Sequence, residues 1–521
     1  MALSALIAFA LLSPLGVLAI DAHDTGWSEI HRVLFRERTL VLLRHTIVLA
    51  VLVALFAVII GVATAWCTER TRLPARRMWT VMLVLPVAIP DFVVGYAWHS
   101  IAPTINALFA ATLVMTLGTY PLVYLPVAAA LRRSDPTMED TARSLGVGRL
   151  RTFFRVTLPL IRTAVLGGCV LVVLTVISEY GVFEILRYQT FTTEIFNQFQ
   201  FDPQAAAALA VPLVCIALLV LAVDGIIPRR TATATAPRRT PMLARWRWTA
   251  IPVLVALSAL VLLAVGVPIG TLIYWMTRGQ HTTLSANATL ASATWATVRY
   301  SAAGAAIAVV LALPVAMMTF RGSSAPRTVL DRSTFVTQAL PGVVVALSLV
   351  FFATHYAFRL YHTSVLLVVA YAILNFPLAL VCVKTSVAQA SALLEDVGRS
   401  LGRGRIAVFV RVTLPLIAPG LLAGFCLVFL TAVTELTATL VLRPFQVQTL
   451  ATQFWAFQSE VAYGAAAPYA FVIIALAVVP GALLGLWFDR EQHGRTDPPL
   501  RRGRRWFGSE GRYASVGVPI D

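Results

Sequence analysis

Long apolar runs alternate with short polar segments along the whole chain. Each of twelve runs is long enough to cross, as a helix, the roughly 30 Å hydrocarbon core of a bilayer. The pattern predicts an all-α polytopic membrane protein, because 59% of the residues are hydrophobic, more than a soluble protein could bury. The predicted spans cover about 1–20, 40–66, 78–99, 105–131, 161–183, 204–227, 248–276, 297–320, 333–353, 362–385, 417–440 and 466–488.

The first run, Met1–Ile20, could also be a signal peptide. However, it lacks a basic start, and its apolar part does not lead into a small-x-small cleavage site. We therefore expect it to be retained as the first span.

Arginines concentrate in the polar segments on one side of this topology. The segment 228–247 holds six arginines and no acidic residue. Because cytoplasmic loops carry an excess of basic residues, this side is predicted to be the cytoplasm, with both termini there. Membrane orientation thus explains the net charge of +17, and no nucleic-acid partner is expected. The chain is predicted to comprise a first half, a linker, a second half and a basic tail at 1–227, 228–247, 248–488 and 489–521.

One polar segment occurs twice. Residues 139–161 and 395–417, here called the first and second islands, are identical at 16 of 23 positions, with a constant offset of 256 residues. Their apolar flanks match far less well, although a polar loop between spans would be expected to drift. Since an even number of predicted spans separates the islands, both lie on the same side, and the halves are predicted to be two parallel six-helix repeats. The duplication predicts two equivalent docking surfaces.

The islands resemble the coupling motif of ATP-binding-cassette (ABC) importer permeases, which has an acidic start, a glycine seven positions on, then Phe and Leu-Pro. In that family the segment forms two short cytoplasmic helices that seat in a groove of the ATPase subunit. Many relatives have Glu-Ala-Ala where this chain has Glu-Asp-Thr and Glu-Asp-Val. The resemblance implies that six residues couple the chain to an ATPase: Glu139, Gly146, Pro159, Glu395, Gly402 and Pro415.

The glycines and prolines of the islands have a physical reason to be there. Glycine permits a tight turn between short helices, where a side chain would obstruct close approach, and this is the role expected of Gly146 and Gly402. Proline is tolerated in the first turn of a helix but not in its interior. Pro159 and Pro415 are therefore expected to end one helical stretch and to open the next.

The resemblance covers nearly the whole chain. Residues 178–199, SEYGVFEILRYQTFTTEIFNQF, and residues 434–455 look like the ferric-iron branch, in which one chain fuses two six-span halves of the type I importer permease fold. The resemblance implies a bacterial inner-membrane permease, two copies of a cytoplasmic ATPase that binds ATP and Mg²⁺, and an extracytoplasmic protein that delivers ferric iron. Fused permeases for thiamine, phosphonates and sulfate or polyamines are similar, so these substrates stay open.

Few acidic residues lie inside the apolar runs. Glu179 and Glu435 are equivalent across the repeat, and Asp91 follows Pro90, which loosens the local helix. A carboxylate within a span is costly and usually faces the bundle interior or a water-filled cavity. These three residues are therefore predicted to line the translocation pathway. The alternative is that each glutamate is a structural hydrogen-bonding group near the end of a span.

No catalytic or metal site is expected from the remaining residues. The only lysine, Lys384, follows Val383 rather than the glycine that a phosphate-binding loop needs, so we expect the chain to carry no ATP site or other cofactor. The five cysteines occur singly, without disulfide or metal-ligand spacing. The eight histidines form no catalytic arrangement, and we expect the chain not to be an enzyme.

Two other classes of protein share some of these features. An ion-coupled secondary transporter would need polar coupling sites at mid-membrane and would have no duplicated cytoplasmic island. A membrane-embedded enzyme would need a clustered polar site, which the sequence does not show. A neighbouring gene for a soluble ATPase would separate the importer permease from both alternatives.

Overall fold

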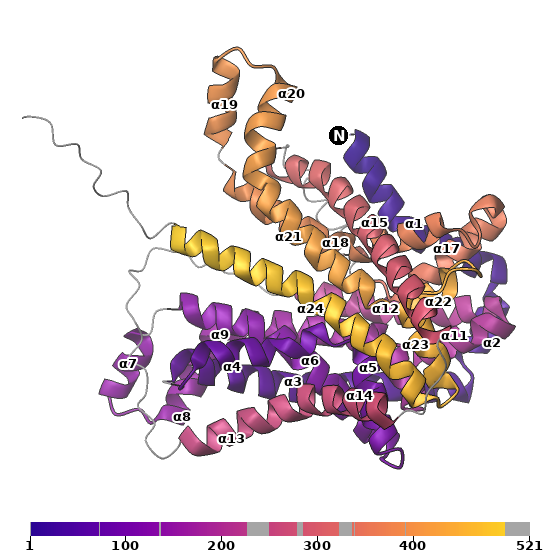
Figure 1. The fold of residues 1–521 in the computed structure, drawn as a ribbon, viewed down its shortest axis with the longest axis horizontal. Coiled ribbons are helices and arrows are strands. Elements are labelled where there is room, and N and C mark those ends of the chain that lie inside the picture. Colours follow the sequence, from indigo (N-terminus) through magenta and orange to yellow (C-terminus); the bar gives the residue numbers. More distant parts are fainter. Residues whose placement is uncertain are drawn as a thin grey trace, which may run out of the picture. The chain divides into compact units, whose positions relative to one another are not determined.

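The computed structural model describes residues 2–71, 73–134, 137–226, 250–278, 285–321, 336–337, 339–390 and 392–494. Within these ranges every regular element is a helix (Figure 1). The prediction of an all-α polytopic membrane protein is confirmed. The predicted linker 228–247 and the chain after residue 494 lie outside the described residues, and the domain boundaries stay a prediction.

The helices of both halves follow in chain order. Those of the first half are α1 (Ala2–Thr25), α2 (Trp27–Leu34), α3 (Glu37–Arg70), α4 (Arg76–Val84), η1 (Leu85–Ala88), α5 (Asp91–Ile101), α6 (Ala107–Arg133), α7 (Thr137–Ser144), α8 (Arg149–Thr152), η2 (Phe153–Thr157), α9 (Leu158–Ser178), α10 (Gly181–Ile185), α11 (Phe191–Phe201) and α12 (Pro203–Ile226). Those of the second half are α13 (Ala250–Val261), η3 (Leu262–Gly266), α14 (Val267–Arg278), α15 (Ser285–Arg321), α17 (Gly342–Tyr356), η4 (Phe358–Leu360), α18 (Ser364–Gln389), α19 (Ala392–Ser400), α20 (Arg405–Val408), η5 (Phe409–Thr413), α21 (Leu414–Val433), α22 (Thr437–Leu442), α23 (Leu450–Ser459) and α24 (Tyr463–Gly494).

Nine continuous helices among the described residues are long and apolar enough to cross a membrane. The bent pair formed by 76–88 and 91–101 makes ten if it counts as one span. The apolar helices Phe9–Asp21 and Gly342–Tyr356, where two more spans were predicted, are shorter than a full crossing. Every predicted span thus has an apolar helix, but the lengths do not confirm the count of twelve.

The span predicted at 78–99 is wrong as a single straight helix. Its two parts meet at an angle of 89°, at the break before Asp91. Pro90 causes the break, because a proline has no N–H to continue the helix and its ring clashes with the preceding turn. The break places Asp91 at the first position of α5 instead of inside a span.

The two halves repeat one packing pattern. In the first half α3, α6 and α9 pack against one another, and in the second half α15, α18 and α21 do the same. Thr46 Oγ1 accepts a hydrogen bond from the N–H of Phe191, the first residue of α11, at 3.2 Å. Thr297 Oγ1 accepts one from Leu450, the first residue of α23, at 2.9 Å. The repeat therefore extends from the long helices to the short ones.

The first helix of each half packs against the other half. α1 contacts α15 and α17, and Ile7, Leu11 and Leu18 belong to one buried apolar cluster with Val343 and Leu367. In the same way α14 contacts α5, and η3 contacts α6. Because the halves share their cores, residues 1–481 form one compact unit. Residues 482–494 continue α24 as helix.

Candidate functional site

Each island folds into two short helices. The first consists of α7 and α8, and the second of α19 and α20. Gly146 and Gly402, which follow the first helix of each pair, have φ angles of +79° and +76°. The N–H of Gly146 donates to Arg143 O at 3.0 Å and that of Val147 to Ala142 O at 3.1 Å, which is a Schellman cap. The bonds at Gly402 and Arg403 repeat this cap.

The structure corrects the physical reason expected for these glycines. A Cβ added to Gly146 or Gly402 would meet no atom of this chain within 4 Å, so close approach within the chain is not the constraint. The constraint is the left-handed backbone, which glycine adopts without steric cost. The corner remains open, with Leu145 and Leu401 largely exposed beside the glycines.

Pro159 and Pro415 lie in the first turn of α9 and of α21, as expected, but the helix before them is not interrupted. α8, η2 and α9 form one continuous helix over Leu150–Ser178, and α20, η5 and α21 form another over Arg405–Val433. Pro159 and Pro415 lie just after a π-helical turn in each, η2 and η5. A π turn widens the helix where the proline cannot donate its hydrogen bond. Sequence reasoning missed both π turns, because the repeated Phe-x-Arg-Val-Thr-Leu-Pro shows duplication but not the local helix geometry.

The leading glutamates of the islands are buried rather than displayed. Glu139 and Glu395 are 3% and 6% exposed. Glu139 Oε1 accepts a hydrogen bond from Arg70 Nε, at the end of α3, at 3.2 Å. Glu395 Oε1 accepts one from Thr413 Oγ1, in the π turn η5, at 2.5 Å. Glu139 thus joins its island to α3, and Glu395 joins the two ends of its own island, while each places negative charge in the first turn of α7 or α19.

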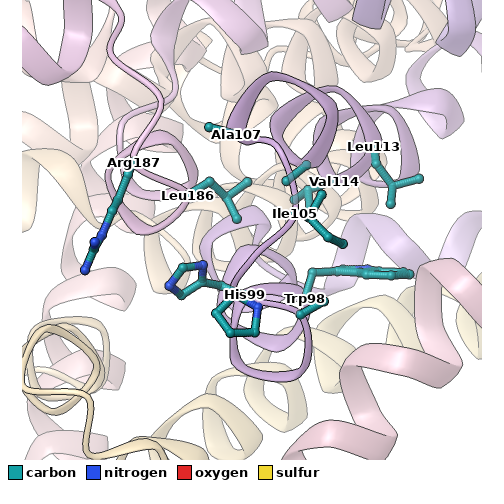
Figure 2. Close-up of a pocket in the computed structure, with 11 residues that line it drawn as sticks. Trp98, His99, Ile105, Ala107, Leu113, Val114, Leu186 and Arg187 are labelled. Carbon is teal, nitrogen blue, oxygen red and sulfur yellow. The ribbon is translucent and has the colours of Figure 1, made fainter.

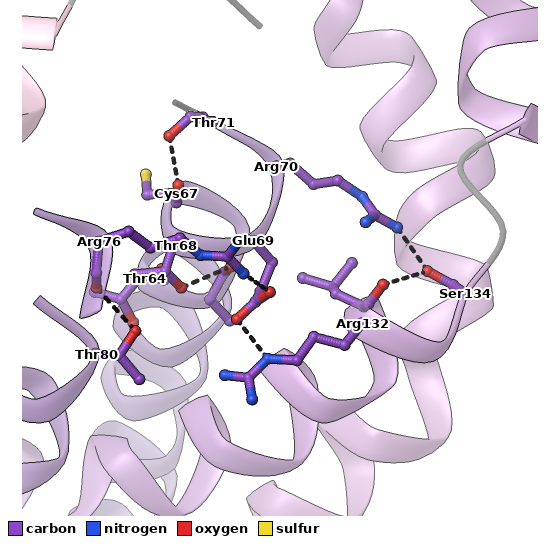
Figure 3. A network of polar contacts seen from close by, with 12 residues as sticks. Thr64, Cys67, Thr68, Glu69, Arg70, Thr71, Arg76, Thr80, Arg132 and Ser134 are labelled. Atoms are coloured by element: carbon purple, nitrogen blue, oxygen red, sulfur yellow. Dashed lines mark hydrogen bonds and ion pairs between the residues drawn. The ribbon is translucent and has the colours of Figure 1, made fainter. Parts of the chain in front are cut away.

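A polar network holds the ends of α3 and α6 beside the first island (Figure 3). Glu69 is buried and forms ion pairs with Arg76 and with Arg132, whose Nε lies 2.8 Å from Glu69 Oε1. Arg70 also donates to Ser134 Oγ at 2.6 Å. The network holds the end of α3 against the end of α6. The first island follows directly after α6.

Both islands expose apolar side chains. A contiguous apolar surface on a soluble face is typical of a protein–protein contact. On the first island the exposed large apolar residues are Leu145, Leu150, Phe154 and Leu160, and on the second they are Val397, Leu401, Ile406, Val410 and Leu416.

The predicted pathway glutamates stand at two helix breaks. α9 ends at Ser178 and α21 at Val433, several residues before the predicted ends of these spans. Glu179 Oε1 accepts a hydrogen bond from the N–H of Val182 at 3.0 Å, at the start of α10. Glu435 Oε1 accepts the equivalent bond from Ala438 at 3.1 Å, at the start of α22. Each glutamate therefore caps the short helix that follows it.

The two breaks meet across the halves, and Asp91 joins them. A Cβ added to Gly181 would lie 2.8 Å from Leu436 Cδ2, so the chain after Glu179 touches the chain after Glu435. Both Asp91 and Glu435 are close enough to Glu179 to interact with it electrostatically. The structure thus brings together all three predicted pathway residues.

All three carboxylates lie deep in the protein but remain partly accessible to solvent. A charged group in such a place needs water or a polar partner, because burying an unpaired charge is costly. Among the described residues no three His, Cys, Asp or Glu side chains are arranged to hold a metal ion. The arrangement can offer oxygen atoms to a passing cation without a closed cage.

Sequence reasoning missed the residue that makes room for Asp91. Gly118 lies inside α6, and a Cβ added there would be only 2.1 Å from Asp91 Oδ1. Glycine inside a helix costs roughly 1 kcal/mol of stability relative to alanine. The clash that any side chain at position 118 would make with Asp91 explains why a glycine is found there. An isolated glycine in an apolar helix was the available signal, but nothing in the sequence connected it to Asp91.

Comparisons with known proteins agree with this arrangement. The family model of the binding-protein-dependent transport system inner membrane component matches residues 57–233 and 304–493. The chain is 34% identical over 486 residues to the Fe(3+)-transport system permease protein FbpB 2 of Haemophilus influenzae, covering 92% of this chain and 96% of that protein. It is 26% identical over 234 residues to the sulfate transport system permease protein CysT of Salmonella typhimurium, covering 40% and 84%. It is 30% identical over 147 residues to the molybdenum transport system permease protein ModB of Escherichia coli, covering 25% and 64%.

Each matched segment contains one island and one of the glutamate breaks. The resemblance to ABC importer permeases, and to their ferric-iron branch, is therefore confirmed. The chain belongs to the family of inner-membrane components of binding-protein-dependent transport systems, the permeases of ABC importers.

Proposed function

We propose that this permease imports ferric iron, which a binding protein delivers and which passes between the two halves beside Asp91, Glu179 and Glu435. The observation that carries the proposal is the meeting of these three carboxylates in a chain that matches an iron permease over 92% of its length. Iron is here the cargo and not a resident cofactor.

The charge of the pathway favours a cation as cargo. Hard cations prefer oxygen ligands, and three carboxylates at one crossing offer them. The same carboxylates would repel an oxyanion such as sulfate, for which one relative is named. An uncharged or anionic substrate would not be attracted by these three carboxylates.

The hydrogen bonds of the two glutamates favour weak, transient binding of an ion over tight binding. One oxygen of Glu179 and one of Glu435 accept hydrogen bonds from the backbone, which leaves fewer free oxygens to surround an ion. A site that bound the ion tightly would trap it. The structural alternative is therefore compatible with the pathway: each glutamate caps a short helix and also presents its carboxylate to the crossing.

The islands support a role in coupling to an ATPase. Two corners with the same left-handed glycine, the same π turn and exposed apolar residues present two matching surfaces. We propose that each surface receives one cytoplasmic ATPase subunit, so that one permease chain binds two of them. Both islands and both termini would then face the cytoplasm, as the arginine distribution predicts. ATP and Mg²⁺ would be bound by the partner subunits alone.

Transport by the reconstituted complex tests the proposal. The permease is purified with its cognate ATPase, placed in liposomes, and supplied with ATP inside and with binding protein loaded with ⁵⁵Fe(III) outside. We expect uptake of iron that depends on ATP and on the binding protein, and none of labelled sulfate or thiamine. Uptake of sulfate or thiamine, with no iron uptake, would overturn the choice of cargo. A complex with two permease chains for each ATPase pair would overturn the stoichiometry.

A further inference from the structure

A cavity of about 290 Å³ lies in the first half, between the end of α5, the start of α6 and the loop after α10 (Figure 2). Since α6 runs from this cavity to the first island, about 40 Å away at 1.5 Å per residue, the cavity is at the opposite end of the helix from the island. None of its lining residues is acidic. Its polar side chains are Trp98, His99 and Arg187, and Leu186, Ile105 and Val114 form part of its apolar wall.

Three side chains around this cavity can donate hydrogen bonds. The Trp98 indole nitrogen is buried and has no hydrogen-bond partner. The side chains of Arg187 and His99 interact electrostatically with each other, and neither side chain forms a hydrogen bond or ion pair with any residue that the structure describes. A buried donor without an acceptor costs about 1–3 kcal/mol. The buried Trp98 N–H, beside the exposed Arg187 and half-exposed His99 side chains, therefore favours a ligand that accepts hydrogen bonds.

Arg187 occupies a backbone position where glycine is the usual residue. Its φ angle is +55°, and its N–H donates to Glu184 O at 3.1 Å while that of Tyr188 donates to Phe183 O at 2.8 Å. This is the Schellman cap of α10, with arginine at the left-handed position. A non-glycine residue there is strained, and such strain persists mainly at functional sites. The strain holds an arginine at the rim of the cavity.

The second half shows that the fold itself does not require these donors. The residues equivalent to Trp98 and His99, counted from Pro90 and Pro341 at the helix starts, are Leu349 and Val350. The counterpart of Arg187 is Arg443, which has a negative φ angle of −60°. Its side chain donates to Val447 O at 3.2 Å, so its guanidinium already has an acceptor. The donor set thus belongs to the first half alone.

We propose that this cavity binds a carboxylate or another small oxyanion, held by the Arg187 guanidinium, the Trp98 indole N–H and the His99 ring. A charged acceptor forms stronger hydrogen bonds with such donors than a neutral one. The volume is many times the ~10–15 Å³ that one water needs on this measure, so a carboxylate group fits. The carboxylate can come from a free anion or from an acidic side chain of a docked binding protein. The site is separate from the pathway carboxylates and does not depend on the identity of the cargo.

Fluorine NMR of the Trp98 indole tests the proposal directly. The complex with its ATPase is labelled with 5-fluorotryptophan in nanodiscs, and Trp98→Phe identifies one signal among the 11 tryptophans. Acetate and inorganic phosphate are added first, and the cognate binding protein is added in a separate titration. We expect a saturable shift of the Trp98 signal, and in Arg187→Gln a shift that needs about tenfold more ligand or is lost. Arg443→Gln is the matched control and should respond like the parent.

The outcomes separate the two sources of the carboxylate. A response to acetate or phosphate shows a free anion, whereas a response to the binding protein alone, lost in Arg187→Gln, shows an acidic side chain of that partner. Arg187→Gly should lose the response without a lower unfolding temperature, because glycine relieves the strained backbone. No response to any probe, or an equal response in parent and Arg187→Gln, overturns the proposal. Because no transport is measured, these results stand whether or not iron is the cargo.

Discussion

The two halves of the chain place the start of equivalent helices, α5 and α17, beside the proposed pathway, but they surround it with different side chains. In the first half α5 begins with Asp91, and Gly118 of α6 leaves space for its carboxylate. In the second half α17 begins with Gly342, and the residue equivalent to Gly118 is Leu374. A Cβ added to Gly342 would lie 3.1 Å from Glu435 Oε1. Large and small residues have thus been exchanged between the halves.

This exchange means that the proposed pathway is not symmetric. Of its three carboxylates, the first half contributes Asp91 and Glu179 and the second half contributes Glu435. A second carboxylate in the second half, at the position of Gly342, would have to approach Glu435 closely, and like charges at short range repel. The backbone of the repeat was kept because the packing of the helices depends on it, and the side chains at the crossing could diverge.

The two islands differ less, because their geometry is set by the backbone. Both have a left-handed glycine, a π turn and exposed apolar residues. Glu139 accepts from Arg70 and Glu395 from Thr413, and each also pairs with an arginine one turn on, Arg143 or Arg399. In both islands the leading glutamate is thus buried and bonded.

The largest effect is expected from a side chain at the left-handed corners. Gly146→Val and Gly402→Val force a β-branched residue to a positive φ angle, which costs about 1–3 kcal/mol and displaces the corner. Each variant should lower substrate-stimulated ATP hydrolysis at least about tenfold while insertion in the membrane stays normal. The control is Gly404→Ala, at a φ of −63° with no atom near the added Cβ. Normal ATP hydrolysis in only one of the two variants would show that the two islands do not contribute equally to coupling.

A large effect is also expected from making the first half like the second. In Gly118→Leu the new side chain enters the space of the Asp91 carboxylate, so iron uptake should fall about tenfold. The double variant Asp91→Gly/Gly118→Leu should recover the parental unfolding temperature but not the uptake, since packing is restored and the carboxylate is absent. Gly167→Leu, where no atom lies within 4 Å of an added Cβ, is the control. Parental rates of iron uptake in both variants would show that Asp91 does not line the pathway.

A smaller effect is expected from neutralising the glutamates. Glu179→Gln and Glu435→Gln keep the hydrogen bond to the short helix but remove the charge, so each should slow uptake by up to about fivefold. Glu435→Gln should be slower, because its half has no second carboxylate, and the double variant slower still. Capture of iron by the binding protein should not change. If both single variants transport at the parental rate, the two glutamates serve only as helix caps.

The smallest effect on transport, but a measurable one on stability, is expected at the leading glutamates of the islands. Glu139→Gln leaves the buried guanidinium of Arg70 without its charge partner, a loss of about 3 kcal/mol. Glu395→Gln removes the charge that pairs with Arg399, so a loss in the same direction is expected. Unfolding temperatures of the purified variants measure both losses, with Asp140→Asn on α7 as the control. A parental unfolding temperature in either variant would show that its glutamate does not stabilise the island.

The sequence by itself determined the class of fold and where its functional segments lie. Apolar runs long enough to cross a membrane can only be helices, because the bilayer core leaves no other partner for the backbone. The duplication located the two islands, and the rarity of acidic residues in apolar runs located Asp91, Glu179 and Glu435. These inferences needed only local composition and the spacing of the repeat.

The tertiary structure decided how these segments are shaped and which of them meet. The 89° break at Pro90 and the π turns before Pro159 and Pro415 depend on how neighbouring helices accommodate a proline, which one sequence cannot show. The packing of α1 and α14 onto the opposite halves is a long-range contact with no local signal. The fit of Asp91 to Gly118 joins residues on two helices, and only their packing distance makes that glycine necessary.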